Sequence, residues 1–208
     1  YFILDVTDPE SPPEVIAELA LPEQGFTTAF PAVIIMRNQT ITAGNVTFDE
    51  PGDWYLLLGS GPRSSDGADT TALTNATSSE PVVLYAVDLL RLVRDGELWM
   101  LDNNGLLQQA DPSGTTPYPV YAELDDNAFV SDPITVDTDL DFNTDVAYFG
   151  TVEGESGTWG GRMRRLVMES NTDETTWQTD STLIDLTHAT ISGSVGNGQP
   201  VVAPASVG

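Results

Sequence analysis

The chain has 208 residues, of which 32 are acidic and 7 basic, and its formal charge is −25 with no cysteine and no lysine. This acidity makes nucleic acid and anionic membrane surfaces poor partners, because both attract clustered basic side chains. The missing cysteines exclude disulfides, thiolate metal sites and cysteine nucleophiles. No apolar run approaches the roughly 20 residues that span a bilayer, and the 40% hydrophobic content is enough for one core.

Short apolar runs bounded by turn-forming residues predict an all-β chain. In chain order, the predicted strands are Tyr1–Val6, Ala32–Met36, Trp54–Leu58, Val82–Val87, Leu98–Leu101, Asp145–Gly150 and Met163–Met168. One segment, Glu14–Leu21, has a helical pattern, and prolines confine it on both sides. The segment Gly59–Ser79 has no periodic apolar pattern, which predicts a long surface loop.

Several of these runs resemble one another. Y-F-I-L-D-V-T from Tyr1, V-L-Y-A-V-D-L from Val83 and V-A-Y-F-G-T-V from Val146 share an aromatic residue within an apolar strand. A-F-P-A-V-I-I from Ala29 and V-S-D-P-I-T-V from Val130 both place proline just ahead of a strand, a position where proline is tolerated. Such repetition favours a β-propeller built from residues 1–208 as part of one domain, and a β-sandwich is the alternative.

The stretch V-D-T-D-L-D-F-N-T-D, from Val136 to Asp145, places acidic or amide side chains at every second position. Calcium takes six to eight oxygen ligands, and calcium loops supply them from positions 1, 3, 5, 7 and 9. These positions are Asp137, Asp139, Asp141, Asn143 and Asp145, and we expect Asn143 to contribute mainly its main-chain carbonyl. The alternative is an acidic turn without a metal.

The loop differs from an EF-hand in two places. Phe142 stands where that motif has glycine, and Tyr148 stands where it has a bidentate glutamate. The sequence therefore predicts a different calcium loop, placed between strands.

Several segments along nearly the whole chain resemble, and occur in the same order as in, the PilY family of type IV pilus tip-associated adhesins and biogenesis factors. They are Y-F-I-L-D-V-T-D-P from Tyr1, G-F-T-T-A-F-P-A-V from Gly25, W-Y-L-L-L-G-S-G from Trp54, V-L-Y-A-V-D-L from Val83, the acidic loop, and Q-P-V-V-A-P-A-S-V-G from Gln199. Two features depart from the family. Gly160–Leu166 replaces the usual G-N-L-W-x-F-D strand, and the N-terminal von Willebrand-like part is absent, so we expect these residues to be part of a longer molecule.

The resemblance implies a non-enzymatic C-terminal β-propeller with Ca²⁺ held by Asp137, Asp139, Asp141, Asn143 and Asp145. It implies an extracellular place at the pilus tip or bacterial cell surface, with pilin or minor pilins and host or abiotic surfaces as partners. In this family, calcium occupancy is tied to pilus extension and retraction, surface attachment and twitching motility. A quinoprotein-like propeller enzyme and an integrin-like calcium-binding propeller without a pilus link remain alternatives.

Other polar clusters have less specific patterns. Arg162, Arg164 and Arg165 could receive a carboxylate of a partner, although pairing with acidic neighbours in the sheet is the simpler interpretation. Asp125, Asp126 and nearby Glu123 could serve a glycosidase, but adjacent carboxylates are expected by chance in so acidic a chain. His188 is the only histidine, which favours a structural role.

Overall fold

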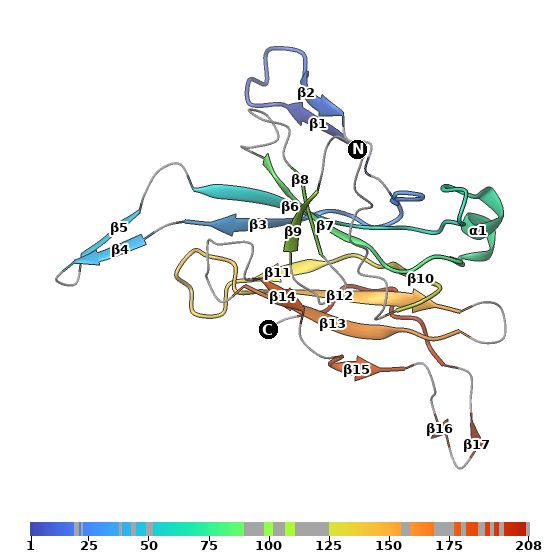
Figure 1. The fold of residues 1–208 in the computed structure, drawn as a ribbon. Helices are drawn as coiled ribbons and strands as arrows, with labels where there is room; N and C mark the ends of the chain where they lie inside the picture. The colour runs from blue at the N-terminus through green and yellow to red at the C-terminus, as the bar shows by residue number, and fades with distance from the viewer. Residues whose placement is uncertain are drawn as a thin grey trace.

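The computed structural model of this chain is mostly β-strand with a single short helix among its assigned elements (Figure 1). It describes residues 1–18, 21, 23–37, 39–42, 45–48, 52–89, 98–101, 107–110, 125–154, 159–168, 177–179, 182–186, 190–191, 194–195 and 198–206. The all-β prediction is confirmed. The described part of the chain contains no helix with the length and apolar content of a membrane span.

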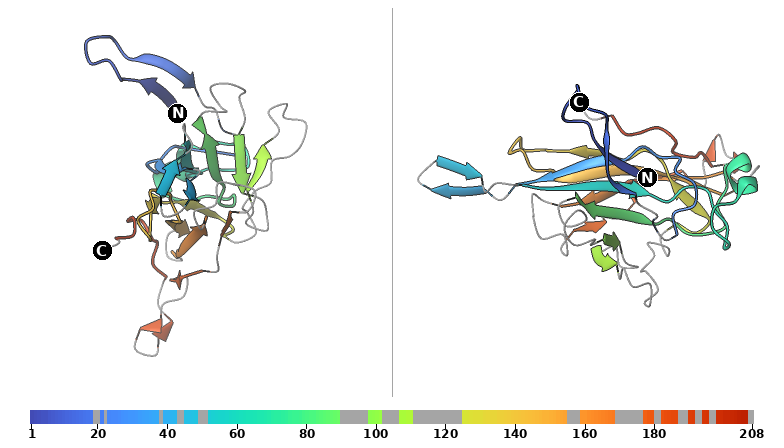
Figure 2. Two further views of the ribbon diagram at one scale, coloured as in Figure 1. Left: turned by 90° about the vertical axis from the view of Figure 1, so that its left-hand side faces the viewer. Right: turned by 90° about the horizontal axis from the view of Figure 1, so that it is seen from above.

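The first large sheet is an antiparallel meander of five strands in the order β3-β6-β7-β8-β9. Its strands are β3 (Ala32–Met36), β6 (Asp53–Gly59), β7 (Leu84–Asp88), β8 (Leu98–Leu101) and β9 (Leu107–Ala110). Pairing of Ile34 with Tyr55 and of Leu57 with Ala86 fixes the register of its first three strands. A hairpin of β4 (Gln39–Thr42) and β5 (Asn45–Phe48) is inserted between β3 and β6 and extends away from one end of the sheet (Figures 1 and 2).

The second large sheet is also antiparallel and is centred on the long strand β12 (Val146–Glu153). One edge of β12 pairs with two short strands in succession, β10 (Ala128–Val130) and β11 (Ile134–Val136). The other edge pairs with β13 (Arg162–Val167), which in turn pairs with β14 (Gln178–Thr179) and β15 (Ile184–Asp185). Pro31 and Pro133 lie immediately ahead of β3 and β11, as the sequence predicts.

The two sheets share one apolar core. Each contributes side chains from one of its faces, since alternate residues of a strand point to opposite faces. Leu57, Leu84 and Ala86 of the first sheet share this core with Phe149 and Leu166 of the second. Trp177 is fully buried in the same core, and its ring lies 4.9 Å from that of Tyr55 in an edge-to-face arrangement.

The opposite face of the first sheet carries a second core. Tyr85 and Val87, which alternate with Leu84 and Ala86 along β7, lie here with Leu58 and are buried. Tyr1 and Ile3 pack against them. Strand β7 is therefore buried on both faces, which explains its unbroken apolar sequence.

Two local predictions need revision. The helical pattern of Glu14–Leu21 gives no helix in its described part, because Glu14–Glu18 forms strand β2 and pairs antiparallel with β1 (Phe2–Asp5). The segment Gly59–Ser79, predicted as a long surface loop, begins with five buried residues and contains helix α1 (Thr70–Asn75), which the Asp69 carboxylate caps by accepting from the Thr71 amide. The last strands, β16 (Thr190–Ile191) and β17 (Ser194–Val195), form a small hairpin.

Candidate metal centre

The acidic loop connects two adjacent antiparallel strands of the second sheet. Strand β11 ends at Val136, strand β12 begins at Val146, and Val136 and Val146 pair with each other. The Asp145 amide also donates to the Val136 carbonyl at 3.0 Å. The two ends of the loop are thus held together, so its side chains are confined to a small volume.

Asp137 organises the backbone of the loop. Its carboxylate accepts hydrogen bonds from the amides of Leu140 at 2.6 Å and Phe142 at 2.9 Å, with a longer one from Asp141 at 3.3 Å. Leu140 and Phe142 both have positive φ, 63° and 71°. Phe142, which stands at the glycine position of an EF-hand, therefore adopts the left-handed conformation that glycine usually supplies.

Three carboxylates converge in the loop. Asp137, Asp139 and Asp145 each offer an oxygen atom, and these atoms all lie within 4.8 Å of one another. Calcium binds oxygen at about 2.3–2.6 Å, so two oxygens on one ion can be at most about 5 Å apart. The three side chains as placed are therefore compatible with a single shared calcium ion.

The other two predicted ligands are turned to different partners. The Asp141 carboxylate accepts from the Asn143 amide at 2.8 Å and from Asn143 Nδ2 at 3.1 Å. Asn143 is buried, and its Oδ1 accepts from the Arg37 amide at 2.5 Å. The structure thus gives the Asn143 side chain a role in joining the loop to the first sheet, which the sequence pattern did not indicate.

Contacts of the loop with β3 continue through the next residue. The Thr144 amide donates to the Ile35 carbonyl at 2.9 Å, and Thr144 Oγ1 accepts from the Ile35 amide at 3.1 Å. Thr135, on β11, donates from its hydroxyl to the Val33 carbonyl at 2.8 Å. The contacts of Asn143, Thr144 and Thr135 with residues 33–37 join the sheets at the loop, and we call them the loop seam.

The charges in the loop repel one another. Asp139 is exposed, and partial desolvation followed by the nearby Asp141, Asp145 and Asp137 carboxylates raises its pKa. Asp145 is only 8% exposed, and its carboxylate accepts from Thr138 through both the amide and the hydroxyl, at 2.6 and 2.5 Å. A bound divalent cation would offset the repulsion, since an opposite charge favours the ionised form of each carboxylate.

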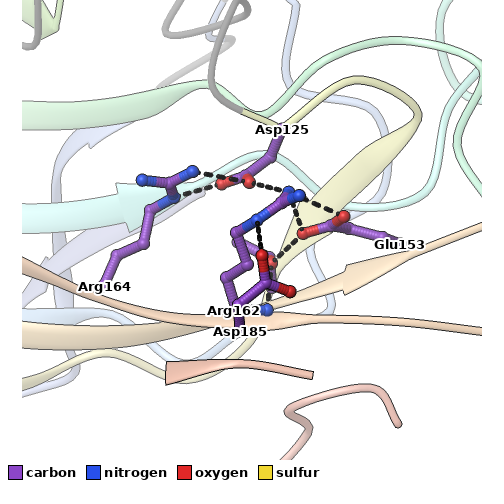
Figure 3. Close-up of polar contacts among 6 residues, drawn as sticks. Asp125, Glu153, Arg162, Arg164 and Asp185 are labelled. Atoms are coloured by element: carbon purple, nitrogen blue, oxygen red, sulfur yellow. Dashed lines mark hydrogen bonds and ion pairs between the residues drawn. The ribbon is translucent and has the colours of Figure 1, made fainter. Parts of the chain in front are cut away.

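A second polar cluster, shown in Figure 3, lies at the other end of β12. Asp125 is fully buried and receives Arg164 through two nitrogens, Nη2 at 2.7 Å and Nε, and it also receives Arg162 Nη1 at 2.6 Å. Arg162 Nη1 lies 2.8 Å from both oxygens of Glu153, and Arg162 Nε lies 3.4 Å from Asp185. We call Asp125, Glu153, Arg162 and Arg164 the arginine clasp.

The clasp bears on two of the weaker sequence hypotheses. Arg162 and Arg164 pair with acidic neighbours, as the simpler interpretation of the basic cluster expected. Asp125 is held by both of these arginines, whereas Asp126 is exposed, so the two do not form a matched pair of carboxylates. Glu123 and His188 lie outside the described residues.

Sequence reasoning did not identify Glu153 as a member of this cluster. It lies 28 residues from Asp125 in the chain and is brought close only by the pairing of β10 with β12. The indication available was an acidic residue at the end of an apolar strand, opposite a strand with alternating arginines. Comparison of the chain with models of known protein families, with curated proteins and with solved structures found no match.

Proposed function

We propose that this chain is a calcium-binding β-propeller portion of a type IV pilus tip adhesin or biogenesis factor, acting in pilus extension and retraction, surface attachment and twitching motility. The observation that carries the calcium proposal is the convergence of Asp137, Asp139 and Asp145 within 4.8 Å. The loop offers oxygen ligands alone, and hard cations such as Ca²⁺ prefer such ligands.

Calcium fits this loop better than magnesium does. Magnesium requires near-ideal octahedral geometry at about 2.0–2.1 Å and retains several waters, whereas calcium accepts irregular sets of carboxylates and carbonyls. Asp137, Asp139 and Asp145 would hold the ion. Asp141 and the Asn143 carbonyl belong to the ligand set that the sequence predicts, and they can complete it if the Asp141 carboxylate turns from Asn143.

The proposed role of the ion is electrostatic. Without a cation, the clustered aspartates repel one another, and the hydrogen bonds to Asp137 and Asp145 hold the loop against this repulsion. With a cation, the repulsion becomes attraction and the loop is ordered more firmly. Because Asn143 and Thr144 join the loop to β3, that order extends to the first sheet and to the neighbouring β4–β5 hairpin.

The propeller proposal rests on the arrangement of the two sheets. Both sheets are antiparallel, each contains a strand preceded by proline, β3 or β11, and the two share one apolar core. The two proline-preceded strands, β3 and β11, are linked directly through Thr135 and Val33. Blades of a propeller are antiparallel four-stranded sheets arranged around a central channel, and β11, β12, β13 and β14 follow one another in such an order within the larger second sheet.

The pilus proposal rests on the ordered sequence segments that resemble the PilY family. It places the chain outside a bacterial cell, with pilin or minor pilins as partners and a host or abiotic surface as a further contact. The high negative charge is consistent with a protein exposed to solvent and salt.

The first test is calorimetric titration of Ca²⁺ into metal-stripped protein, with Mg²⁺ as the competing ion. We expect one site for Ca²⁺, weaker binding of Mg²⁺, and a higher melting temperature with Ca²⁺ bound. Asp139→Asn should weaken binding, and Asp126→Asn, an exposed carboxylate outside the loop, should leave it unchanged. No heat and no thermal shift at millimolar Ca²⁺ would overturn the calcium proposal.

The pilus role needs a separate test in the source bacterium. Replacing the native gene with the Asp139→Asn variant should alter twitching and surface attachment, while the Asp126→Asn variant behaves as the native protein does. If the wild-type protein binds calcium in vitro and the Asp139→Asn strain nevertheless twitches normally, an integrin-like propeller without a pilus link is favoured. A redox cofactor detected by absorbance in the purified protein would favour the quinoprotein-like enzyme.

A further inference from the structure

The arginine clasp contains more acceptor oxygens than its shared donor can satisfy. Arg162 Nη1 carries two hydrogens, yet three carboxylate oxygens lie within 2.8 Å of it, one from Asp125 and two from Glu153. Arg164 is already committed to Asp125 through two nitrogens. The cluster therefore has room for one more hydrogen, and a proton on Glu153 would supply it.

The charges around Glu153 lead to the same conclusion. The groups that face it are Asp125 from the turn before β10, Arg162 from β13 and the Thr151 hydroxyl of its own strand. Arg164 and Asp185 lie one step further away, on Asp125 and Arg162 respectively. Asp185 is a third carboxylate against two guanidinium groups, so ionisation of Glu153 leaves an excess of negative charge in a place where its side chain is only 12% exposed.

The clasp holds a segment that joins the two sheets. The Asp125 carbonyl accepts from the Val82 amide at 3.3 Å, and the Ala128 amide donates to the Glu80 carbonyl at 3.1 Å. The Val130 amide donates to the Ser60 carbonyl at 2.9 Å. Residues 125–130 are therefore bonded to the first sheet and its connections through their backbone, and the Asp125 side chain anchors them to β13 of the second.

We propose that the arginine clasp is a proton-binding site in which uptake of one proton, at Glu153 beside Asp125, strengthens the attachment of residues 125–130 and so the joint between the two sheets. A protonated Glu153 can donate a hydrogen bond to Asp125 and no longer competes with it for Arg162 Nη1, while Arg162 Nε still faces Asp185. An ionised Glu153 competes with Asp125 for the same guanidinium nitrogen and repels it. The proposal is independent of calcium, because the loop lies at the opposite end of β12.

The direction of the pH dependence follows from the acidity of Glu153 in the folded protein. Burial, and then the Asp125 carboxylate, raise the pKa of Glu153 to about 7, while Thr151 and Arg162 act in the opposite sense. A carboxyl with a raised pKa binds more protons in the folded than in the unfolded state. Ionisation of Glu153 therefore lowers the free energy of unfolding as the pH rises from the unfolded pKa, near 4.5, to the folded pKa, near 7. Above that pH its contribution does not change further.

The test compares wild type with Glu153→Gln, which imitates the protonated side chain at every pH. The melting temperature of metal-stripped protein is measured between pH 5 and 8 for both. We expect the two melting temperatures to differ little near pH 5 and the variant to be more stable at pH 8, by about 7–14 °C for a chain of this length. Asp126→Asn, a neighbouring exposed carboxylate, should keep the wild-type profile.

A variant that is less stable than wild type at pH 8 would overturn the proposal, since it would mean that ionised Glu153 is a favourable partner of Arg162. If Glu153→Gln fails to fold, carbon-13 NMR of the wild-type Glu153 carboxyl, assigned through bonds, decides the matter. An inflection close to pH 7 supports the proton site. An inflection in the ordinary range of glutamate, about 4.3, overturns it.

Discussion

Two isosteric substitutions in the acidic loop are expected to change the stability of the metal-free protein in opposite directions. In Asp145→Asn, a nearly buried charged acceptor becomes neutral while two hydrogen bonds from Thr138 depend on it. Bonds to charged groups contribute about 1.5–3 kcal/mol and neutral ones about 0.5–1.5, so the loss is about 1 kcal/mol for each. The sum, about 2 kcal/mol, should lower the melting temperature by about 4–8 °C.

In Asp139→Asn, the balance of interactions is reversed. Asp139 is exposed, and the hydrogen bond recorded for its carboxylate in the described loop is a long one, 3.2 Å from the Asp141 amide. The surrounding carboxylates disfavour its ionised form and contribute to its raised pKa. Removing its charge should therefore raise the melting temperature of the metal-free protein. Both substitutions remove the charge of a proposed ligand and should weaken calcium binding by about tenfold or more.

The assay is thermal unfolding in chelator and again in saturating Ca²⁺, with calorimetric titration of each variant. We expect Asp139→Asn to be more stable than wild type in chelator and to show a smaller rise in melting temperature when calcium is added. If Asp139→Asn destabilises the metal-free protein as much as Asp145→Asn does, repulsion among the aspartates is not the dominant effect in the loop. If it binds calcium as wild type does, Asp139 is not a ligand.

Further predictions concern backbone geometry. A Cβ at Gly59 would lie 2.4 Å from the Val130 Cβ, so Gly59→Ala must push β6 from β10 and should cost about 1–3 kcal/mol in urea unfolding, and an unchanged midpoint would contradict this close approach. Phe142 has φ of 71° and is 66% exposed, so Phe142→Gly should preserve both stability and calcium affinity, whereas the β-branched Phe142→Val should cost about 1–2 kcal/mol. Equal melting temperatures of these two variants would contradict the left-handed conformation at this residue.

The strands could be predicted from the sequence wherever an apolar run carries its own boundaries. Ala32–Met36 and Leu98–Leu101 are strands with the predicted bounds, and the turn-forming or proline residues that flank such runs explain why. The strand at Glu14–Glu18 cannot be recognised from the sequence, because a run of five residues does not distinguish a helical from a strand period. Its pairing with β1 makes it a strand, and this pairing cannot be predicted from the local sequence.

The candidate metal site could be located from the sequence, but its geometry could not. The alternation of Asp137, Asp139, Asp141, Asn143 and Asp145 predicts that all five supply ligands to one ion. The positive φ values at Leu140 and Phe142 break that alternation, so the Asp141 carboxylate turns to Asn143 instead of joining the group of three. Where Asn143 points depends on Arg37, which is more than 100 residues away in the chain.

The polar contacts between the two sheets are concentrated at the two ends of β12, and this placement has a consequence for how the protein responds to its surroundings. The loop seam precedes Val146 and the arginine clasp includes Glu153, so the two are separated by about 23 Å of strand. Between them lies the apolar core, whose stability depends little on ions or protons. If both proposals hold, cations at one end and protons at the other adjust the joint between the sheets while the core keeps both sheets folded. In a protein that bears load between such sheets, calcium and mild acidity would each stabilise the joint between the sheets independently. Their effects on the melting temperature should therefore add.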